Sequence, residues 1–72
     1  MWLVEKRRTV GAFTTIGADA DIHKAKSIME EAIEDLGYPE ADAQWRDPTP
    51  EIPFCVKYGN EHNNIILRIR KI

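Results

Sequence analysis

Residues 21–36, which read DIHKAKSIMEEAIEDL, have the periodicity of an amphipathic helix and decide the fold class. Asp19 or Asp21 can accept hydrogen bonds from the unpaired backbone N–H groups of the first turn. Gly37 suits the left-handed position that follows a last turn, and Pro39 cannot continue a helix. The sequence therefore predicts a helix over 21–36. Its apolar residues recur every third or fourth position, as one stripe requires: Ile22, Ala25, Met29, Ala32, Ile33 and Leu36.

The segments on either side of this helix have the composition and alternation of strands. The charged stretch 5–8 either ends the first strand or lies in the turn that follows it. Residues 47–53 contain three prolines and form a stiff, extended connector. In the last strand, apolar residues alternate with Arg68 and Arg70. Strands are predicted over about 2–6, 10–16, 53–58 and 65–71, with a short strand over 42–46 as an open alternative.

Together these elements predict one small α+β domain over residues 1–72. The order ββαβ(β)β favours a mostly antiparallel β-sheet packed against one amphipathic helix. This order, the length and the basic last strand ILRIRKI resemble the β-grasp arrangement of ubiquitin-like modifiers. The resemblance does not extend to conjugation, because Arg70, Lys71 and Ile72 stand where such modifiers need Gly-Gly.

Length and composition exclude several classes of protein. The chain has 72 residues, a net charge of −2 and one cysteine. No apolar run approaches the roughly 20 residues of a membrane-spanning helix, and the N-terminal residues lack the pattern of a signal peptide. A lone cysteine cannot form a disulfide framework, so Cys55 is expected to be a reduced thiol. We expect a cytoplasmic protein without a membrane partner.

Charge is segregated along the chain. Residues 1–17 have a net charge of +2, residues 18–51 of −7 and residues 52–72 of +3. The basic ends and the acidic middle predict two faces of opposite electrostatic character.

The acidic character is strongest in the second half of the predicted helix. Acids there face the negative end of the helix dipole, and like charges four residues apart repel, so this placement does not favour stability. The pattern predicts an acidic surface that binds a basic partner protein. That partner offers either a Lys/Arg patch or a nucleic-acid-binding groove, which the acidic surface would occupy by mimicking nucleic acid. The alternative is a solvated face partly neutralised by Lys26 and Arg46. The predicted partner-binding residues are Glu30, Glu31, Glu34 and Asp35.

The basic strands support a second hypothesis, a nucleic-acid-binding surface. Phosphate binding needs basic side chains clustered on one exposed surface. Against it, Lys and Arg on strands also commonly prevent edge-to-edge aggregation. The candidate residues are Arg7, Arg8, Arg68, Arg70 and Lys71, which Lys6 and Lys57 would extend.

Nothing in the sequence predicts catalysis. Cys55, His23 and His62 lack the spacing of a zinc site, and no phosphate loop or nucleophile motif is present. We therefore predict a non-enzymatic protein without catalytic residues, metal or cofactor. Trp45 is interpreted as a cover for the core or, less favoured, as an exposed interface residue.

We predict a small protein-binding inhibitor or regulator that is a monomer or a homodimer. In size and charge it resembles phage and mobile-element proteins that block host machinery. A structural subunit that assembles through its sheet is the third hypothesis.

Overall fold

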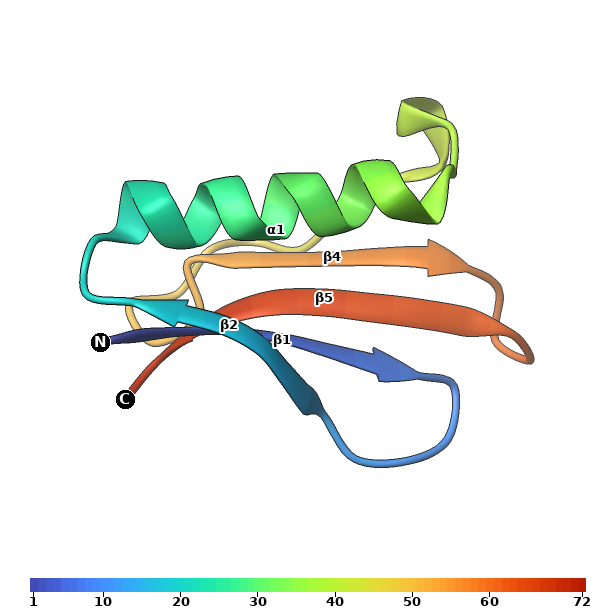
Figure 1. The fold of residues 1–72 in the computed structure, drawn as a ribbon. Helices are drawn as coiled ribbons and strands as arrows, with labels where there is room; N and C mark the ends of the chain where they lie inside the picture. The colour runs from blue at the N-terminus through green and yellow to red at the C-terminus, as the bar shows by residue number, and fades with distance from the viewer.

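The computed structural model describes residues 1–72 and contains one helix on one face of a five-stranded antiparallel sheet (Figure 1). Helix α1 (Ile22–Leu36) follows the first two strands, and a short 3-10 helix, η1 (Glu40–Asp42), precedes the third. The predicted α+β class, an antiparallel sheet with one amphipathic helix, is confirmed. In spatial order the strands are β2 (Thr14–Asp19), β1 (Trp2–Arg8), β5 (Asn64–Lys71), β4 (Phe54–Gly59) and β3 (Gln44–Trp45).

The likeness to the β-grasp arrangement is limited to the order of elements along the chain. Strands β1 and β5 are neighbours at the centre of the sheet, and they run antiparallel. A β-grasp sheet pairs its first and last strands in parallel. The topology is therefore different.

Both ends of α1 form as the sequence predicts. The carboxylate of Asp21 accepts a hydrogen bond from the backbone N–H of His23 at 2.8 Å, so Asp21 is the N-cap. Gly37 has a φ of 72°, and its N–H donates to the carbonyl of Glu34. Only glycine adopts this conformation at little cost, which explains why the helix ends there.

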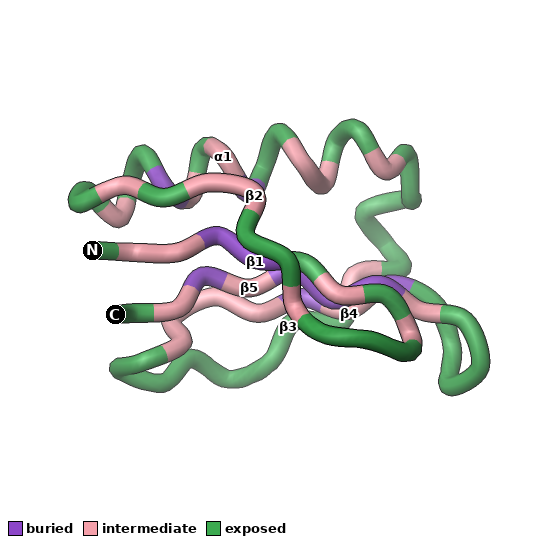
Figure 2. Tube along the Cα trace, turned by 60° about the horizontal axis from the view of Figure 1, so that its bottom comes forward, coloured by how far each residue is buried: buried purple, intermediate pink, exposed green.

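The apolar stripe of α1 packs on the central strands. Ala25 and Met29 are buried, and they share one core cluster with residues of β1, β4 and β5. Figure 2 shows the buried positions concentrated on these three strands and on the sheet side of the helix. The remaining core residues all come from the helix-facing side of the sheet: Val4, Val56, Tyr58, Ile65, Leu67 and Ile69.

The first hairpin differs from the prediction. Strand β1 continues to Arg8, and the second strand lies at Thr14–Asp19, not at 10–16. Pairing with β5 extends the first strand, since Arg7 lies opposite Ile66 and Arg8 opposite Ile65. This long-range pairing moves the turn to residues 9–13, which the β-branched composition of 10–16 does not reveal.

The stretch between helix and fourth strand contains little regular structure. Of residues 42–46, only Gln44 and Trp45 pair with β4. The proline-containing connector then runs past the end of β5, where the backbone N–H of Lys71 donates to the carbonyl of Glu51 at 2.8 Å. No helix in the chain is long and apolar enough to cross a membrane.

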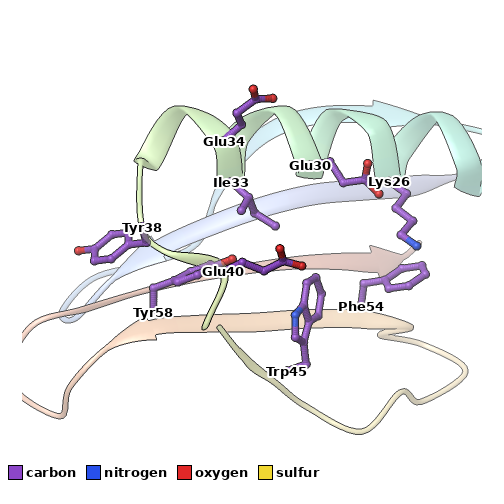
Figure 3. Close-up of a pocket in the computed structure, with 9 residues that line it drawn as sticks. All are labelled: Lys26, Glu30, Ile33, Glu34, Tyr38, Glu40, Trp45, Phe54 and Tyr58. Carbon is purple, nitrogen blue, oxygen red and sulfur yellow. The ribbon is translucent and has the colours of Figure 1, made fainter. Parts of the chain in front are cut away.

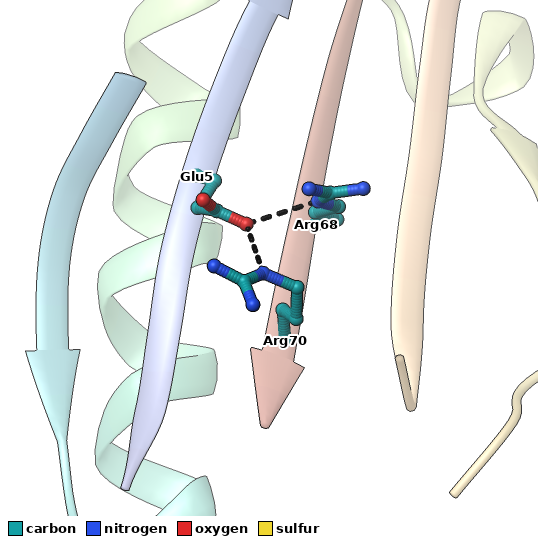
Figure 4. A network of polar contacts seen from close by, with 3 residues as sticks. All are labelled: Glu5, Arg68 and Arg70. Carbon is teal, nitrogen blue, oxygen red and sulfur yellow. Dashed lines mark hydrogen bonds and ion pairs between the residues drawn. The ribbon is translucent and has the colours of Figure 1, made fainter. Parts of the chain in front are cut away.

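One buried charge lies on the face of the sheet that α1 does not cover. Glu5, only 5% exposed, accepts hydrogen bonds at 3.0 Å from Nε of Arg68 and Nε of Arg70 (Figure 4). Burial alone would raise the pKa of Glu5, but the hydrogen bonds from Arg70 and Arg68 and their positive charges lower it below its ordinary value. The charged carboxylate thus links β1 to β5.

We predict that Glu5→Gln lowers the free energy of unfolding by about 2 kcal/mol at neutral pH, because two guanidinium groups lose their ionic partner. The folded-state pKa is depressed, so this stabilisation is complete above the ordinary value of 4.5 and is lost as the pH falls through the folded value. Denaturant titrations of both proteins should therefore converge in acid. Glu61→Gln, at an exposed residue without an ion pair, is the control. Equal stability of Glu5→Gln and wild type at neutral pH would contradict the prediction.

Candidate protein-binding site

The four predicted partner-binding acids all lie on the solvent side of α1. Each is exposed, and none forms an ion pair, because both ion pairs of the chain use Glu5. Neither Lys26 nor Arg46 forms an ion pair with them. The last turn of α1 also contains no basic residue. Glu34 and Asp35 lie in the last turn, where the dipole disfavours a negative charge by about 0.3–1 kcal/mol each, and they repel the like charges of Glu30 and Glu31 one turn earlier.

These four acids point to two flanks of the helix. Glu31 and Asp35 border a hollow that Lys6 of β1 and Leu67 of β5 also line. Glu30 and Glu34 border a larger groove on the other flank. The acidic surface is therefore a ridge with a different hollow on each side.

The larger hollow, hereafter the aromatic groove, has a volume of about 620 Å³ and lies between α1, η1 and the strands β3 and β4 (Figure 3). Trp45 is 52% exposed, and Tyr38 is also exposed. An exposed indole beside a concave surface is typical of a binding site. The groove is lined by Lys26, Glu30, Ile33, Glu34, Tyr38, Glu40, Trp45, Phe54 and Tyr58.

Local structure explains how these side chains meet. The turn after Gly37 leads into η1, which places Glu40 at the groove, and pairing with Val56 holds Trp45 at the sheet edge. In Figure 3 the Glu40 carboxylate lies between the helix and Trp45, whereas Glu34 points away from the strands. Glu30 is directed along the groove, on the same side as Lys26.

Two aromatic contacts define the ends of the aromatic groove. Tyr38 and Tyr58 stack with ring centroids 5.4 Å apart. At the other end, the Nζ atom of Lys26 lies 4.8 Å from the centroid of Phe54, a cation–π contact. Trp45 lies between them without a cationic partner of its own (Figure 3).

The charge of Glu40 reaches the interior of the groove. Burial raises the pKa of Tyr58, and the negative charge of Glu40 raises it further. The phenol is therefore neutral at physiological pH.

The predicted nucleic-acid-binding residues do not form one surface. Arg7, Arg68 and Arg70 lie on the face of the sheet away from α1. Arg8 lies opposite Ile65, and Lys71 lies opposite Trp2. Directly paired residues share a face, so Arg8 and Lys71 lie on the face that α1 covers.

All three open-face arginines are already engaged. The Arg68 guanidinium lies 3.6 Å from the centroid of Phe13, and that of Arg7 lies 5.1 Å from it. Arg68 and Arg70 also share Glu5. The positive charge available to a phosphate is therefore reduced.

Sequence reasoning missed Glu40 and underweighted Trp45. The only signal for Glu40 is its position one residue after Pro39, where the chain turns back, and this does not indicate which way its side chain points. The favoured interpretation of Trp45 as a cover for the core is not what the structure shows: the side chain is exposed, which agrees with the less favoured interpretation.

Comparisons with protein-family models, curated proteins and solved structures find no match to this chain. What the site can bind must follow from its own charges and shape. No three His, Cys, Asp or Glu side chains lie close enough together to hold a metal ion, and Cys55 is a free, half-buried thiol. The arrangement is suited to binding cations by carboxylate and aromatic contacts.

We predict that Glu40→Gln lowers the pKa of Tyr58 toward its ordinary value of 10.0, because it removes a negative charge that disfavours the phenolate. Burial remains, so the pKa should stay above that value. The ring carbon shifts of Tyr58, followed by NMR as the pH is raised, measure this. Asp42→Asn, in the same 3-10 helix, is the matched control. An unchanged Tyr58 titration in Glu40→Gln would mean that Glu40 does not affect the groove interior.

Proposed function

We propose that this chain is a non-enzymatic protein-binding module that acts as an inhibitor or regulator. It binds a basic surface of a partner protein through the acidic outer face of α1. The partner supplies the Lys and Arg side chains that the helix acids lack within their own chain. The free thiol of Cys55 agrees with action in the reducing cytoplasm.

One observation carries the proposal: the four helix acids are exposed and unpaired, they repel one another at a spacing of four residues, and Glu34 and Asp35 also lie where the dipole disfavours them. A helix selected for stability alone would have the opposite charges in its last turns. Binding to a basic surface removes the repulsion between these acids and turns an unfavourable placement into attraction. Complementary charge of this kind also accelerates association and selects the partner.

The basic strands offer less support for nucleic-acid binding. Glu5 already neutralises part of the charge of Arg68 and Arg70, and the remaining basic residues are divided between two faces. None of the acids of the ridge is in an ion pair. We therefore favour a protein partner over nucleic acid.

The test is a pull-down from lysate of the source cell, with and without nuclease, comparing two charge-reversed variants of tagged protein. In the first, Glu30, Glu31, Glu34 and Asp35 are replaced by lysine. In the second, Asp42, Asp47, Glu51 and Glu61 are replaced by lysine, which gives the same net charge elsewhere on the exposed surface. We expect the helix variant to lose its protein partner, with affinity at least about 100-fold weaker. The control variant should retain much more of the binding.

The helix variant should remain folded, because lysines near the end of a helix interact favourably with its dipole. Circular dichroism of the purified variants checks this. Equal retention of the partner by the helix variant and wild type would contradict the proposal, as would equal loss from both variants. Recovery of nucleic acid alone, abolished by nuclease, would move the site to the basic strands.

A further inference from the structure

We infer that the aromatic groove binds one arginine side chain of the partner, with the guanidinium stacked on Trp45 between Glu30 and Glu40. This inference rests on the proposed function and names the side chain that this surface recognises. The aromatic groove would recognise the arginine side chain, whereas the helix acids would attract the basic surface of the partner as a whole.

Two of the four aromatic side chains that line the groove are open to solvent. Tyr38 and Trp45 are the exposed aromatic residues of the chain, and both line this one groove. Trp45 belongs to a two-residue strand at the edge of the sheet, where no further element covers it. Large aromatic rings at the centre of an interface contribute strongly to binding, so an uncovered indole here favours contact with a ligand.

The charge of the groove selects a cation. The carboxylates of Glu30 and Glu40 line it, against the single ammonium of Lys26, whereas that of Glu34 points away from the strands (Figure 3). None of these acids is in an ion pair. A cation entering beside Trp45 therefore gains carboxylate partners without displacing an existing ion pair.

The chain itself demonstrates that the walls of the groove accept a cation. Lys26 places its Nζ atom over Phe54 and does not pair with an acid within 4 Å. This contact occupies the Phe54 end only. The indole of Trp45 is the better cation–π partner of the two ring types, and it carries no cation.

Arginine fits this site better than lysine. Its planar guanidinium can stack on an indole while its edge donates hydrogen bonds to carboxylates. In the aromatic groove the ring of Trp45 offers the flat surface, and Glu40 lines the same groove (Figure 3). An ammonium group gains the charge attraction but lacks the flat stacking surface.

The experiment titrates N-acetyl-arginine amide into isotope-labelled protein and follows the backbone and indole N–H signals by NMR. The citrulline amide is the matched probe, because it keeps the shape of arginine and removes its charge. We expect saturable shifts at the Trp45 indole and around Glu40, with binding of the citrulline probe at least about fivefold weaker. The lysine amide should bind with intermediate strength. The indole of Trp2, a residue packed against the core, is an internal control.

Substitutions in the aromatic groove test whether arginine binds there. Trp45→Ala and the double substitution Glu30→Gln with Glu40→Gln should each weaken arginine binding at least about threefold, whereas Glu61→Gln should not. No saturable shift, equal binding of arginine and citrulline, or shifts that survive Trp45→Ala would overturn the inference.

The same variants separate this inference from the proposed function. If lysine substitution of the four helix acids abolishes partner capture while Trp45→Ala affects neither capture nor arginine binding, the groove assignment is wrong and the proposed function stands. If Trp45→Ala removes arginine binding but the helix variant still captures the partner, the proposed function fails instead.

Discussion

The packing of one helix on one face of the sheet is the interaction on which the rest of the structure depends. Ala25 and Met29 cover the central strands, so the apolar side chains of β1, β4 and β5 gather on that face. The other face has no helix, and there Glu5 is buried by its two arginine partners. The outer side of α1 contributes nothing to this core, which leaves its charges free to serve binding.

Local sequence signals predicted those parts of the fold that depend on neighbouring residues. The stripe of α1, its Asp21 cap and its Gly37 end are encoded within a few residues, and they form as predicted. The first hairpin depends on pairing between β1 and β5, residues more than 50 positions apart, so composition misplaced its turn. The antiparallel pairing of these central strands, which separates the fold from the β-grasp topology, is likewise decided by contacts across the whole chain.

The candidate site shows the same division. The spacing of Glu30, Glu31, Glu34 and Asp35 placed them on the solvent side of a helix from sequence alone. The aromatic groove beside one flank of the helix depends on how η1 and β3 are placed next to α1 by the tertiary fold. Glu40 and Trp45 belong to these two elements, where side-chain direction follows from tertiary packing and not from periodicity. The predicted basic surface does not form, because strand alternation sends Arg7 and Arg8 to opposite faces of the sheet.

Zero-length carbodiimide cross-linking of the protein to its captured partner tests the central claim most directly. The reagent joins a carboxylate to a lysine amine only where the two groups are in contact, and mass spectrometry of the digest identifies the joined residues. Cross-links should be concentrated on Glu30, Glu31, Glu34 and Asp35 of α1. Cross-links confined to acids remote from the helix, such as Asp47, Glu51 and Glu61, would show that the partner binds elsewhere and would contradict the acidic ridge as the binding surface.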